Sequence, residues 1–217
     1  TGKKENKFGV NEKTFTEASK YIKNSKFLNL KCLSVHIGSQ ILSYKPYEKM
    51  LKVIDKVINK TNYQFEFIDL GGGIGVPYGK NNKKFNYKIL NSIIINFLKK
   101  HKFKIIFEPG RSIIADTAIL ISKVTYIKNN KNKKFIILDA AMNDFMRTAL
   151  YNATHKIIPA KKNGKILNKM FEFVGPICES TDKFLVVKKF QNLKEKDLII
   201  ICDVGAYGMS LASNYNV

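Results

Sequence analysis

Glycine is concentrated in one short stretch that could bind an anion. FEFIDLGGGIGV, residues 65–76, runs through mostly apolar residues to Asp69 and then has glycine at four of the five positions 71–75. Because glycine weakens strands and helices, such a cluster needs a specific reason. A tight turn after a buried strand is one reason. Open backbone N–H groups that let a phosphate come close are another.

A second motif places an acid and a base across a turn. Glu108 and Arg111 flank Pro109 and Gly110 in the sequence EPGR. Such a turn can simply end a strand and hold a local ion pair. It can also form a site in which the carboxylate faces a ring nitrogen and the guanidinium binds an anion. The motif by itself allows both interpretations.

A third motif, HIGSQ, begins with His36 at the end of an apolar stretch. A histidine in this position is often a core residue whose hydrogen bonds are satisfied within the protein. Ser39 and the glycine before it also fit a different role, in which the imidazole stacks on a ring beside a phosphate site. His36 and Ser39 are therefore candidate site residues with a plain structural alternative.

Two further motifs lie toward the end of the sequence. Cys178 and Glu179 in GPICES belong either to an ordinary loop or to a site where a thiol acts as an acid. A thiol suits that task because its pKa of about 8.5 can be shifted towards neutrality. Tyr207 lies between Gly205 and Gly208, which predicts a tight bend. The alternative is an ordinary junction between a strand and a helix.

The cysteine pattern argues against a metal site and against disulfides. The three cysteines show no Cys-x-x-Cys spacing, so no metal site is predicted. An odd number without pairing indicates a reducing compartment. Cys32 and Cys202 lie within apolar strands and are expected to be buried as small hydrophobic residues.

Three helices alternate with three apolar strands in the first half of the chain. Continuous apolar strands between helices are typical of a parallel sheet covered by helices. Each strand leads into one of the first three motifs, and this carboxyl edge is where (β/α) barrels carry out chemistry. The predicted helices span 11–24, 46–60 and 86–100, and the predicted strands span 30–37, 65–70 and 103–107.

The pattern changes after about residue 117. Apolar stretches then follow one another without helical spacers, which indicates antiparallel β structure. We therefore expect a barrel domain over 1–117 and a β domain over 118–217. Within the first domain, the helix over 11–24 is expected to bury Phe15, Ala18 and Ile22 on one face.

Composition limits the classes of partner. The 38 lysines and arginines against 17 acids give a formal net charge of +21, which raises the question of nucleic-acid binding. The lysines are scattered, however, and arginine, which is best suited to phosphate and base contacts, occurs only twice. We predict a lysine-rich solvated surface and no nucleic-acid partner. No apolar run approaches the roughly 20 residues that span a bilayer, so no membrane partner is expected.

The ordered motifs HIGSQ, DLGGGIG, EPGRS, DAAMNDFMRTALY, GPICES and GAYGMSLASNYN closely resemble the diaminopimelate decarboxylase family. These enzymes use pyridoxal phosphate and have the alanine racemase/ornithine decarboxylase fold, fold type III. The resemblance covers essentially the whole chain. It implies an α/β plus β fold: the C-terminal part of a pyridoxal-phosphate-binding (β/α)8 TIM-type barrel, followed by part of an antiparallel β domain. Residues 203–217 would return to the active site.

The resemblance also implies roles for individual residues. His36 would stack on the cofactor ring in catalysis, and Glu108 would pair with the pyridine nitrogen. Cys178 would return the proton, acting with Glu179 in the active site of the partner subunit of a homodimer. The cofactor phosphate would be bound by Ser39, Gly71, Gly72, Gly73, Gly110 and Arg111, with Tyr207 closing the pocket. The substrate would be bound by Arg111, Arg147, Tyr151, Glu179 and Tyr207.

The implied reaction converts meso-2,6-diaminopimelate, a small amino-acid substrate, to L-lysine and CO₂ in the cytoplasm. Loss of CO₂ leaves a carbanion that requires a strong electron sink. A carboxylate beside the pyridine nitrogen keeps that nitrogen protonated and strengthens the sink. Arg147 and Tyr151 favour a substrate with a second carboxylate and amine. A sister decarboxylase for arginine, ornithine or carboxynorspermidine, or a non-catalytic homologue, stays open.

Two departures from the family pattern matter. Thr148 occupies a position where the family usually has proline, which we interpret as a minor change at a helix start. The Schiff-base lysine of the family lies in a stretch like YAVKAN, which nothing in the 217 residues matches. The family also continues past SNYN. We therefore expect the chain to be the central half of the enzyme and to be inactive alone.

Overall fold

The computed structural model describes residues 6–79 and 84–216. These residues form two compact units. Unit 1 comprises 6–76 and 84–112, and unit 2 comprises 77–79 and 113–216. The domain boundary expected at 117/118 stays a prediction. No helix in the described part of the chain is both long enough and apolar enough to cross a membrane.

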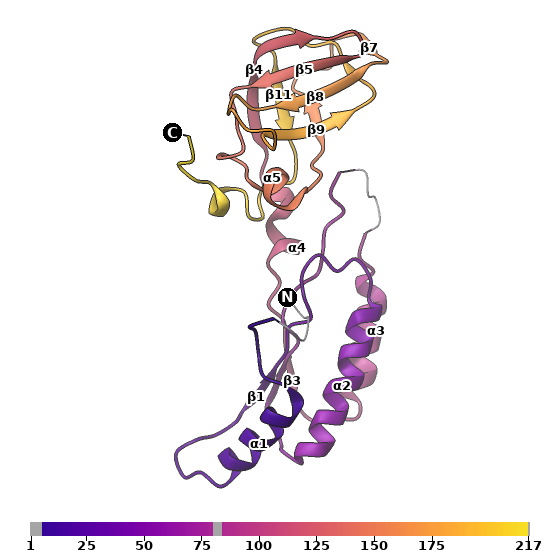
Figure 1. Cartoon of the computed structure of the whole chain (residues 1–217). Coiled ribbons are helices and arrows are strands. Elements are labelled where there is room, and N and C mark those ends of the chain that lie inside the picture. Colours follow the sequence, from indigo (N-terminus) through magenta and orange to yellow (C-terminus); the bar gives the residue numbers. More distant parts are fainter. Residues whose placement is uncertain (1–5, 80–83, 217) are drawn as a thin grey trace. The chain divides into compact units, whose positions relative to one another are not determined.

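Unit 1 has the predicted alternation of strands and helices (Figure 1). Its strands are parallel, in the order β1-β2-β3. The register aligns Ser34, Asp69 and Ile106, so the three strands end at the same level. The elements of unit 1 are α1 (Glu12–Lys23), β1 (Cys32–Ser34), α2 (Lys45–Thr61), β2 (Phe67–Asp69), α3 (Tyr87–Leu98) and β3 (Lys104–Ile106). The short α4 (Arg111–Ile114) begins in unit 1 and ends in unit 2, where a 3-10 turn, Ala115–Thr117, follows it.

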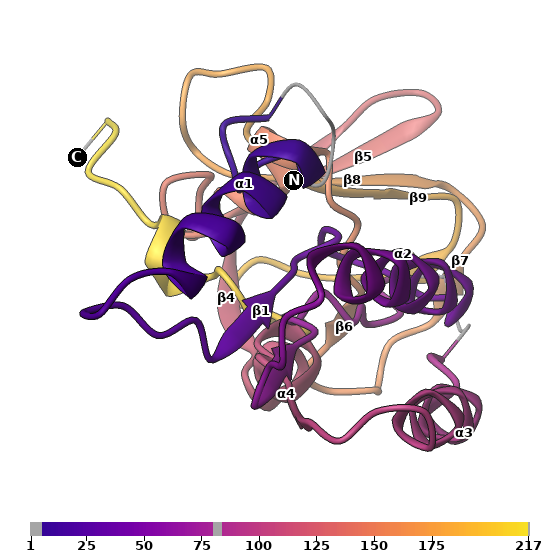
Figure 2. The same ribbon diagram turned by 90° about the horizontal axis from the view of Figure 1, so that it is seen from below.

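The helices of unit 1 cover a single apolar core, and Figure 2 views α3 nearly end-on. The helical spacing predicted for α2 is confirmed, because Tyr47, Met50 and Ile54 are all buried. The face predicted for α1 is partly correct. Phe15 and Ile22 are half-buried, and Phe15 packs against the core, whereas Ala18 is exposed. The fully buried residues of the helix are Thr16 and Ser19. The two hydroxyls tolerate burial because they donate to the Glu12 and Thr16 carbonyls of the same helix.

Unit 2 is built on a six-stranded sheet of order β6-β11-β4-β5-β8-β9, which Figure 1 shows curling around its core. A second, two-stranded sheet pairs β7 with β10. The elements of unit 2 are β4 (Leu120–Asn129), β5 (Lys133–Leu138), α5 (Arg147–Tyr151), β6 (Ile157–Pro159), β7 (Ile166–Leu167), β8 (Met170–Val174), β9 (Lys183–Val187), β10 (Phe190–Gln191), β11 (Leu198–Ile201) and a 3-10 turn, Met209–Leu211.

The predicted antiparallel pairing of this sheet holds for every neighbouring pair except β5 with β8, which is parallel. A parallel pair needs a crossover of a dozen or more residues. The connection between Leu138 and Met170 is long enough, and it contains α5. The sequence pattern missed this pair because α5 is only five residues long.

The core of unit 2 is aromatic and aliphatic, with Phe171, Phe173 and Ile136 fully buried. The predicted burial of two cysteines is only partly correct, because Cys32 and Cys202 are both half-buried. Cys32 lies in β1, which is an edge strand of its sheet, and Cys202 follows the last residue of β11. Both thiols therefore lie at the margin of a sheet and not at its centre.

Several large apolar side chains remain exposed among the described residues. In unit 1, Ile106 and Phe107 at the end of β3 are 39% and 43% exposed. Strand β3 also has no second neighbour among the described residues. An apolar edge of this kind is where a further strand or another chain can pair.

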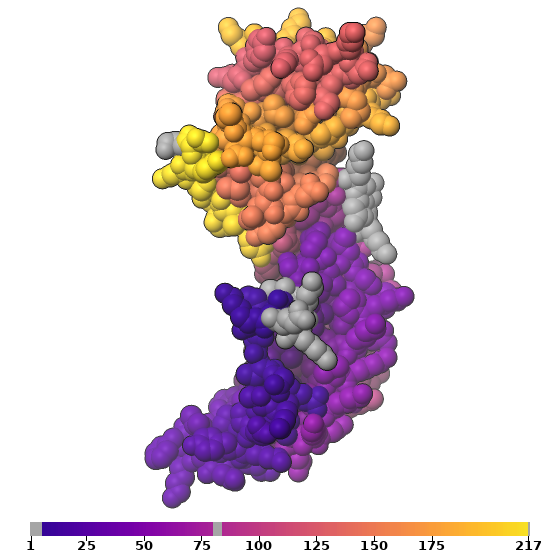
Figure 3. Space-filling model, viewed as in Figure 1, coloured from indigo at the N-terminus to yellow at the C-terminus, as the bar shows by residue number. Residues whose placement is uncertain are grey.

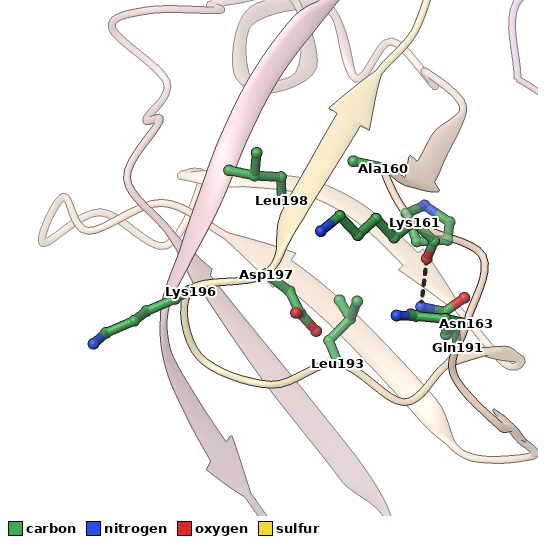
Figure 4. A pocket seen from close by; sticks show the side chains of 9 residues that line it. Ala160, Lys161, Asn163, Gln191, Leu193, Lys196, Asp197 and Leu198 are labelled. Atoms are coloured by element: carbon green, nitrogen blue, oxygen red, sulfur yellow. Dashed lines mark hydrogen bonds between the residues drawn. The ribbon is translucent and has the colours of Figure 1, made fainter.

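One small pocket lies in unit 2 beside the start of β11 (Figure 4). It measures about 160 Å³ and is lined by polar and apolar residues that include Lys161, Gln191 and Asp197. The side-chain amide of Gln191 donates to the Lys161 carbonyl across it. None of the residues predicted to bind cofactor or substrate lines this pocket.

Candidate active site

The glycine stretch of unit 1 lies between the two other strand-end motifs. The N–H of Glu108 donates to the Gly71 carbonyl at 3.0 Å, and the N–H of Ile41 donates to the Gly73 carbonyl at 2.9 Å. A Cβ added to Gly72 would clash with the Glu108 carbonyl, and one added to Gly73 would clash with the Gly38 carbonyl. These glycines are thus required by close backbone packing. Their role at a phosphate stays a prediction.

Two side chains outside the predicted site residues, Asp69 and Tyr47, hold this glycine backbone in place through hydrogen bonds. One oxygen of the buried Asp69 carboxylate accepts the N–H of Gly71 at 2.8 Å, and the other accepts the Ser34 hydroxyl at 3.0 Å. The buried Tyr47 hydroxyl donates to the Gly72 carbonyl at 2.8 Å. Burial, with a smaller effect from Tyr87, raises the pKa of Tyr47 to about 12, so this donor keeps its proton.

The predicted cofactor residues of unit 1 gather at the carboxyl edge of the sheet. His36 and Glu108 follow β1 and β3, and both are exposed. The interpretation of His36 as a satisfied core histidine is therefore wrong. Arg111 Nη2 donates to Ser39 Oγ at 3.3 Å, which joins the HIGSQ and EPGRS motifs. Gly110 has open space where a Cβ would point.

Arg147 is buried in unit 2 at the start of α5, with 5% of its surface exposed. Its Nη1 lies 2.9 Å from His155 Nε2, and its guanidinium carbon lies 4.5 Å from the centroid of the Tyr78 ring. Tyr151, one turn further along the same helix, is 61% exposed. The two predicted substrate residues thus share a short helix but have opposite environments.

Thr148 occupies the second position of α5, which confirms that the departure from proline falls at a helix start. Proline is tolerated in a first helical turn because the N–H there has no partner within the helix. Thr148 is buried, and its hydroxyl has no hydrogen-bond partner in the described structure. Within this first turn, threonine therefore introduces a polar group that the fold does not satisfy.

Cys178 lies in the exposed loop between β8 and β9, which a buried aspartate organises. The Asp182 carboxylate accepts the N–H of Ile177 and, from a segment 40 residues away, the N–H of Met142, both at 2.8 Å. Burial raises the pKa of Asp182 despite the opposing effect of these two N–H groups. A Cβ on Gly175 would clash with this carboxylate, which explains the glycine that opens the loop.

The end of the described chain contacts the same loop. Tyr215 donates its hydroxyl to Glu179 Oε1 at 2.6 Å, and this hydrogen bond raises the pKa of Tyr215. The yellow C-terminal segment lies against the orange surface of unit 2 in Figure 3. Tyr207 lies on a tight bend with a left-handed φ of 62°, followed by a short 3-10 turn. Its place at the cofactor phosphate stays a prediction.

The structure therefore brings the predicted residues together in three groups. The first group lies at the strand ends of unit 1 and consists of His36, Ser39, Gly71 to Gly73, Glu108 and Arg111. In unit 2, Arg147 is held with His155, and Cys178 and Glu179 share one loop. Within the described residues no group of three or more histidines, cysteines or acids is arranged to bind a metal ion.

Comparison with known proteins identifies relatives of the whole chain. Residues 27–205 match the family described as pyridoxal-dependent decarboxylase, C-terminal sheet domain. The full chain is 42% identical over 222 residues to a diaminopimelate decarboxylase of Helicobacter pylori and covers 54% of it. The crystal structure of the diaminopimelate decarboxylase from Helicobacter pylori complexed with L-lysine superposes on the chain with a TM-score of 0.91, with 100% of the chain and 54% of that structure covered.

A more distant structure shares the fold alone. The lysine/ornithine decarboxylase of Vibrio vulnificus complexed with cadaverine has a TM-score of 0.83 at 22% identity, covering 98% of the chain and 59% of that structure. The fold class predicted from the sequence is confirmed by these similarities. The chain spans about half the length of the curated relatives it matches.

Proposed function

The chain belongs to the pyridoxal-dependent decarboxylase family. We propose that it forms part of a diaminopimelate decarboxylase and provides residues that bind the cofactor and the substrate. The enzyme would remove one carboxylate of meso-2,6-diaminopimelate as CO₂ and release L-lysine. The observation that carries this proposal is the 42% identity, over the entire chain, to a diaminopimelate decarboxylase. The more distant lysine/ornithine decarboxylase reaches 22%.

The strand ends of unit 1 fit pyridoxal phosphate in their chemistry. They present an imidazole, a carboxylate, a guanidinium and a hydroxyl on one edge, and Arg111 already contacts Ser39. Arg111 and Ser39 would bind the phosphate, because a cation and a hydroxyl are its natural partners. Glu108 would face the pyridine nitrogen, and His36 would lie against the ring. Both side chains are exposed and able to meet a ligand.

Bound at this edge, pyridoxal phosphate would supply the electron sink that stabilises the carbanion left by CO₂. The task of Glu108 is to hold a proton on the ring nitrogen. The charge of a carboxylate within hydrogen-bond distance favours the protonated form of that nitrogen. The backbone fixed by Asp69 and Tyr47 would keep Glu108 in place through its N–H bond to Gly71.

Unit 2 would recognise the substrate. Arg147 is a buried cation on a fixed helix, and a guanidinium binds a carboxylate through two parallel hydrogen bonds. Burial strengthens such a contact because water screens it less. We assign to Arg147 the substrate carboxylate that the reaction retains. Tyr151 and Glu179 would contact the amine at that end.

Cys178 would return a proton to the carbon that loses CO₂. Its thiol is exposed on a loop whose backbone is fixed by Asp182. Following the family, Cys178 and Glu179 would serve the site of a second subunit in a homodimer. The three unpaired cysteines support a reducing compartment, and we infer the cytoplasm.

The experiment compares substrates in the complete enzyme that carries this chain, loaded with pyridoxal phosphate. CO₂ release is measured from meso-2,6-diaminopimelate, L-ornithine, L-arginine and carboxynorspermidine. We expect diaminopimelate to be preferred by a large factor in kcat/KM. Preference for another of these amines would favour a sister decarboxylase, and no CO₂ from any of them would favour a non-catalytic homologue. The 217-residue chain alone should release none, because it contains no match to the cofactor-binding lysine stretch.

A further inference from the structure

We propose that His155 is a positioning residue that fixes Arg147 for the substrate carboxylate. This inference rests on the proposed function, because it gives Arg147 a substrate to bind. His155 is fully buried in unit 2, with none of its surface exposed. It touches Arg147 directly and belongs to no motif singled out in the sequence. Its role would be to hold the guanidinium in one orientation.

The two ring nitrogens of His155 have partners of opposite kinds. Nδ1 lies 2.9 Å from the backbone carbonyl oxygen of Cys202, and Nε2 lies 2.9 Å from Arg147 Nη1. A carbonyl oxygen can only accept a hydrogen bond, and a guanidinium can only donate one. Nδ1 must therefore carry the proton, and Nε2 must be the acceptor. Both contacts are satisfied only by the neutral imidazole in this single tautomer.

Aromatic rings hold the imidazole and the guanidinium in place. The centroid of the Tyr78 ring lies 4.8 Å from the centroid of the His155 ring and 4.5 Å from the guanidinium carbon of Arg147. Phe145 meets His155 edge-on, with centroids 4.7 Å apart. The carbonyl of Cys202 is itself fixed, because the N–H of the same residue donates to the Lys156 carbonyl beside β6 and β11.

The alternative is that His155 only satisfies a buried arginine and contributes stability. The two roles differ in what they do to the substrate. A purely structural residue lowers the free energy of unfolding when it is replaced. Replacement of a positioning residue also weakens the binding of ligands that carry the carboxylate recognised by Arg147. The same replacement leaves the binding of ligands without a carboxylate unaffected. Preorganisation of this kind saves the cost of ordering a long side chain on binding.

Two variants separate these roles in the complete enzyme loaded with pyridoxal phosphate. In His155→Gln the side-chain oxygen can reach the place of Nε2 and accept from Arg147. In His155→Asn the shorter amide can replace Nδ1 as the donor to Cys202 but does not reach Arg147. We expect His155→Asn to raise KM for diaminopimelate about ten-fold, the loss of one charged hydrogen bond, with kcat little changed. His155→Gln should restore most of the wild-type KM.

Ligand binding provides a second measurement. L-lysine and cadaverine share an amine, but only L-lysine carries a carboxylate. His155→Asn should weaken L-lysine binding about ten-fold and leave cadaverine unchanged. Equal KM values for the two variants, or equal losses for both ligands, would refute the positioning role. A wild-type enzyme that releases no CO₂ from diaminopimelate would instead refute the proposed function.

The wild-type protein also tests the inference if His155→Asn does not fold. Nitrogen-15 chemical shifts of the His155 ring distinguish the two neutral tautomers and the cation. The structure requires the proton on Nδ1 alone. Observation of the Nε2–H tautomer or of the imidazolium at neutral pH would contradict the hydrogen bond from Arg147 and with it the inference.

Discussion

The two units of the molecule position their candidate site residues by different means. In unit 1 the residues follow three parallel strands of aligned register. Backbone hydrogen bonds continue past the strand ends, as between the N–H of Glu108 and the carbonyl of Gly71. In unit 2 the residues lie on loops and on one short helix, and buried side chains hold them. Asp182 organises the Cys178 loop, and His155 contacts Arg147.

This difference has consequences for mutational sensitivity. Where backbone packing sets the site, the positions most sensitive to substitution are the glycines that allow neighbouring backbone segments to approach each other closely. Where side chains set the site, the vulnerable positions are the buried polar groups, because each leaves an unsatisfied partner when it is removed. Substitutions in the two units should therefore differ in kind as well as in size.

The largest effect is expected from Cys178→Ala in the complete enzyme. Loss of the proton donor should reduce kcat by roughly 10²–10⁴-fold, the usual contribution of general acid catalysis. Because Cys178 is not among the residues proposed to bind pyridoxal phosphate, cofactor absorbance should be retained. Cys202→Ala is the matched control, since this half-buried thiol has no proposed role. Near-normal turnover of Cys178→Ala would remove the proton-return role.

Asp182→Ala should destabilise the protein and release the Cys178 loop. It leaves the N–H groups of the half-buried residues Ile177 and Met142 without their acceptor. A fully buried unsatisfied group costs about 1–3 kcal/mol, so the free energy of unfolding should fall by at most about 6 kcal/mol. Denaturant titration measures the loss, and limited proteolysis locates it. A protein as stable as the wild type would show that this carboxylate does not order the loop.

Arg147→Ala should affect substrate binding more than cofactor binding. A charged hydrogen bond contributes about 1.5–3 kcal/mol, so KM for diaminopimelate should rise about 10- to 150-fold. The affinity for pyridoxal phosphate, titrated by absorbance, should change little. Arg111→Ala provides the contrast, because Arg111 lies at the proposed phosphate site of unit 1. Loss of cofactor from Arg147→Ala would make the substrate assignment wrong.

Gly72→Ala tests whether close backbone packing sets the site in unit 1. The new Cβ would clash with the Glu108 carbonyl, and overpacking of this kind costs about 1–3 kcal/mol. Gly110→Ala is the matched control, because nothing lies within 4 Å of its Cβ position. Thermal and denaturant unfolding of the two variants should therefore differ. Equal stability would mean that close backbone packing does not explain the glycine at 72.

The smallest effect is a gain, from Thr148→Val. This change removes a buried hydroxyl that has no hydrogen-bond partner in the described structure and keeps the shape of the side chain. We expect the free energy of unfolding to rise by about 1 kcal/mol. Thr154→Val is a useful control, because Thr154 is exposed. A loss of stability in Thr148→Val would indicate that the hydroxyl finds a partner in the complete enzyme.

Sequence reasoning was most successful where secondary structure repeats. The helix over 46–60 corresponds to α2, Lys45–Thr61, and its apolar spacing gives the buried face. It was only partly right for α1, where Ala18 is exposed and Thr16 and Ser19 are buried, because hydroxyls bonded within the helix can be buried. It also missed the parallel pairing of β5 with β8, which no local pattern records.

The sequence by itself determined which residues follow the strand ends of unit 1. Parallel strands joined by helices bring their carboxyl ends to one edge, so motif order and strand order place His36, the glycines and Glu108 together. Only the tertiary structure decided how unit 2 holds its residues. Asp182 meets Met142 from 40 residues away, Tyr215 meets Glu179 from 36, and His155 meets Cys202 from 47. Contacts of that range depend on how loops fold over a sheet, and neither hydrophobic periodicity nor local motif spacing contains that information.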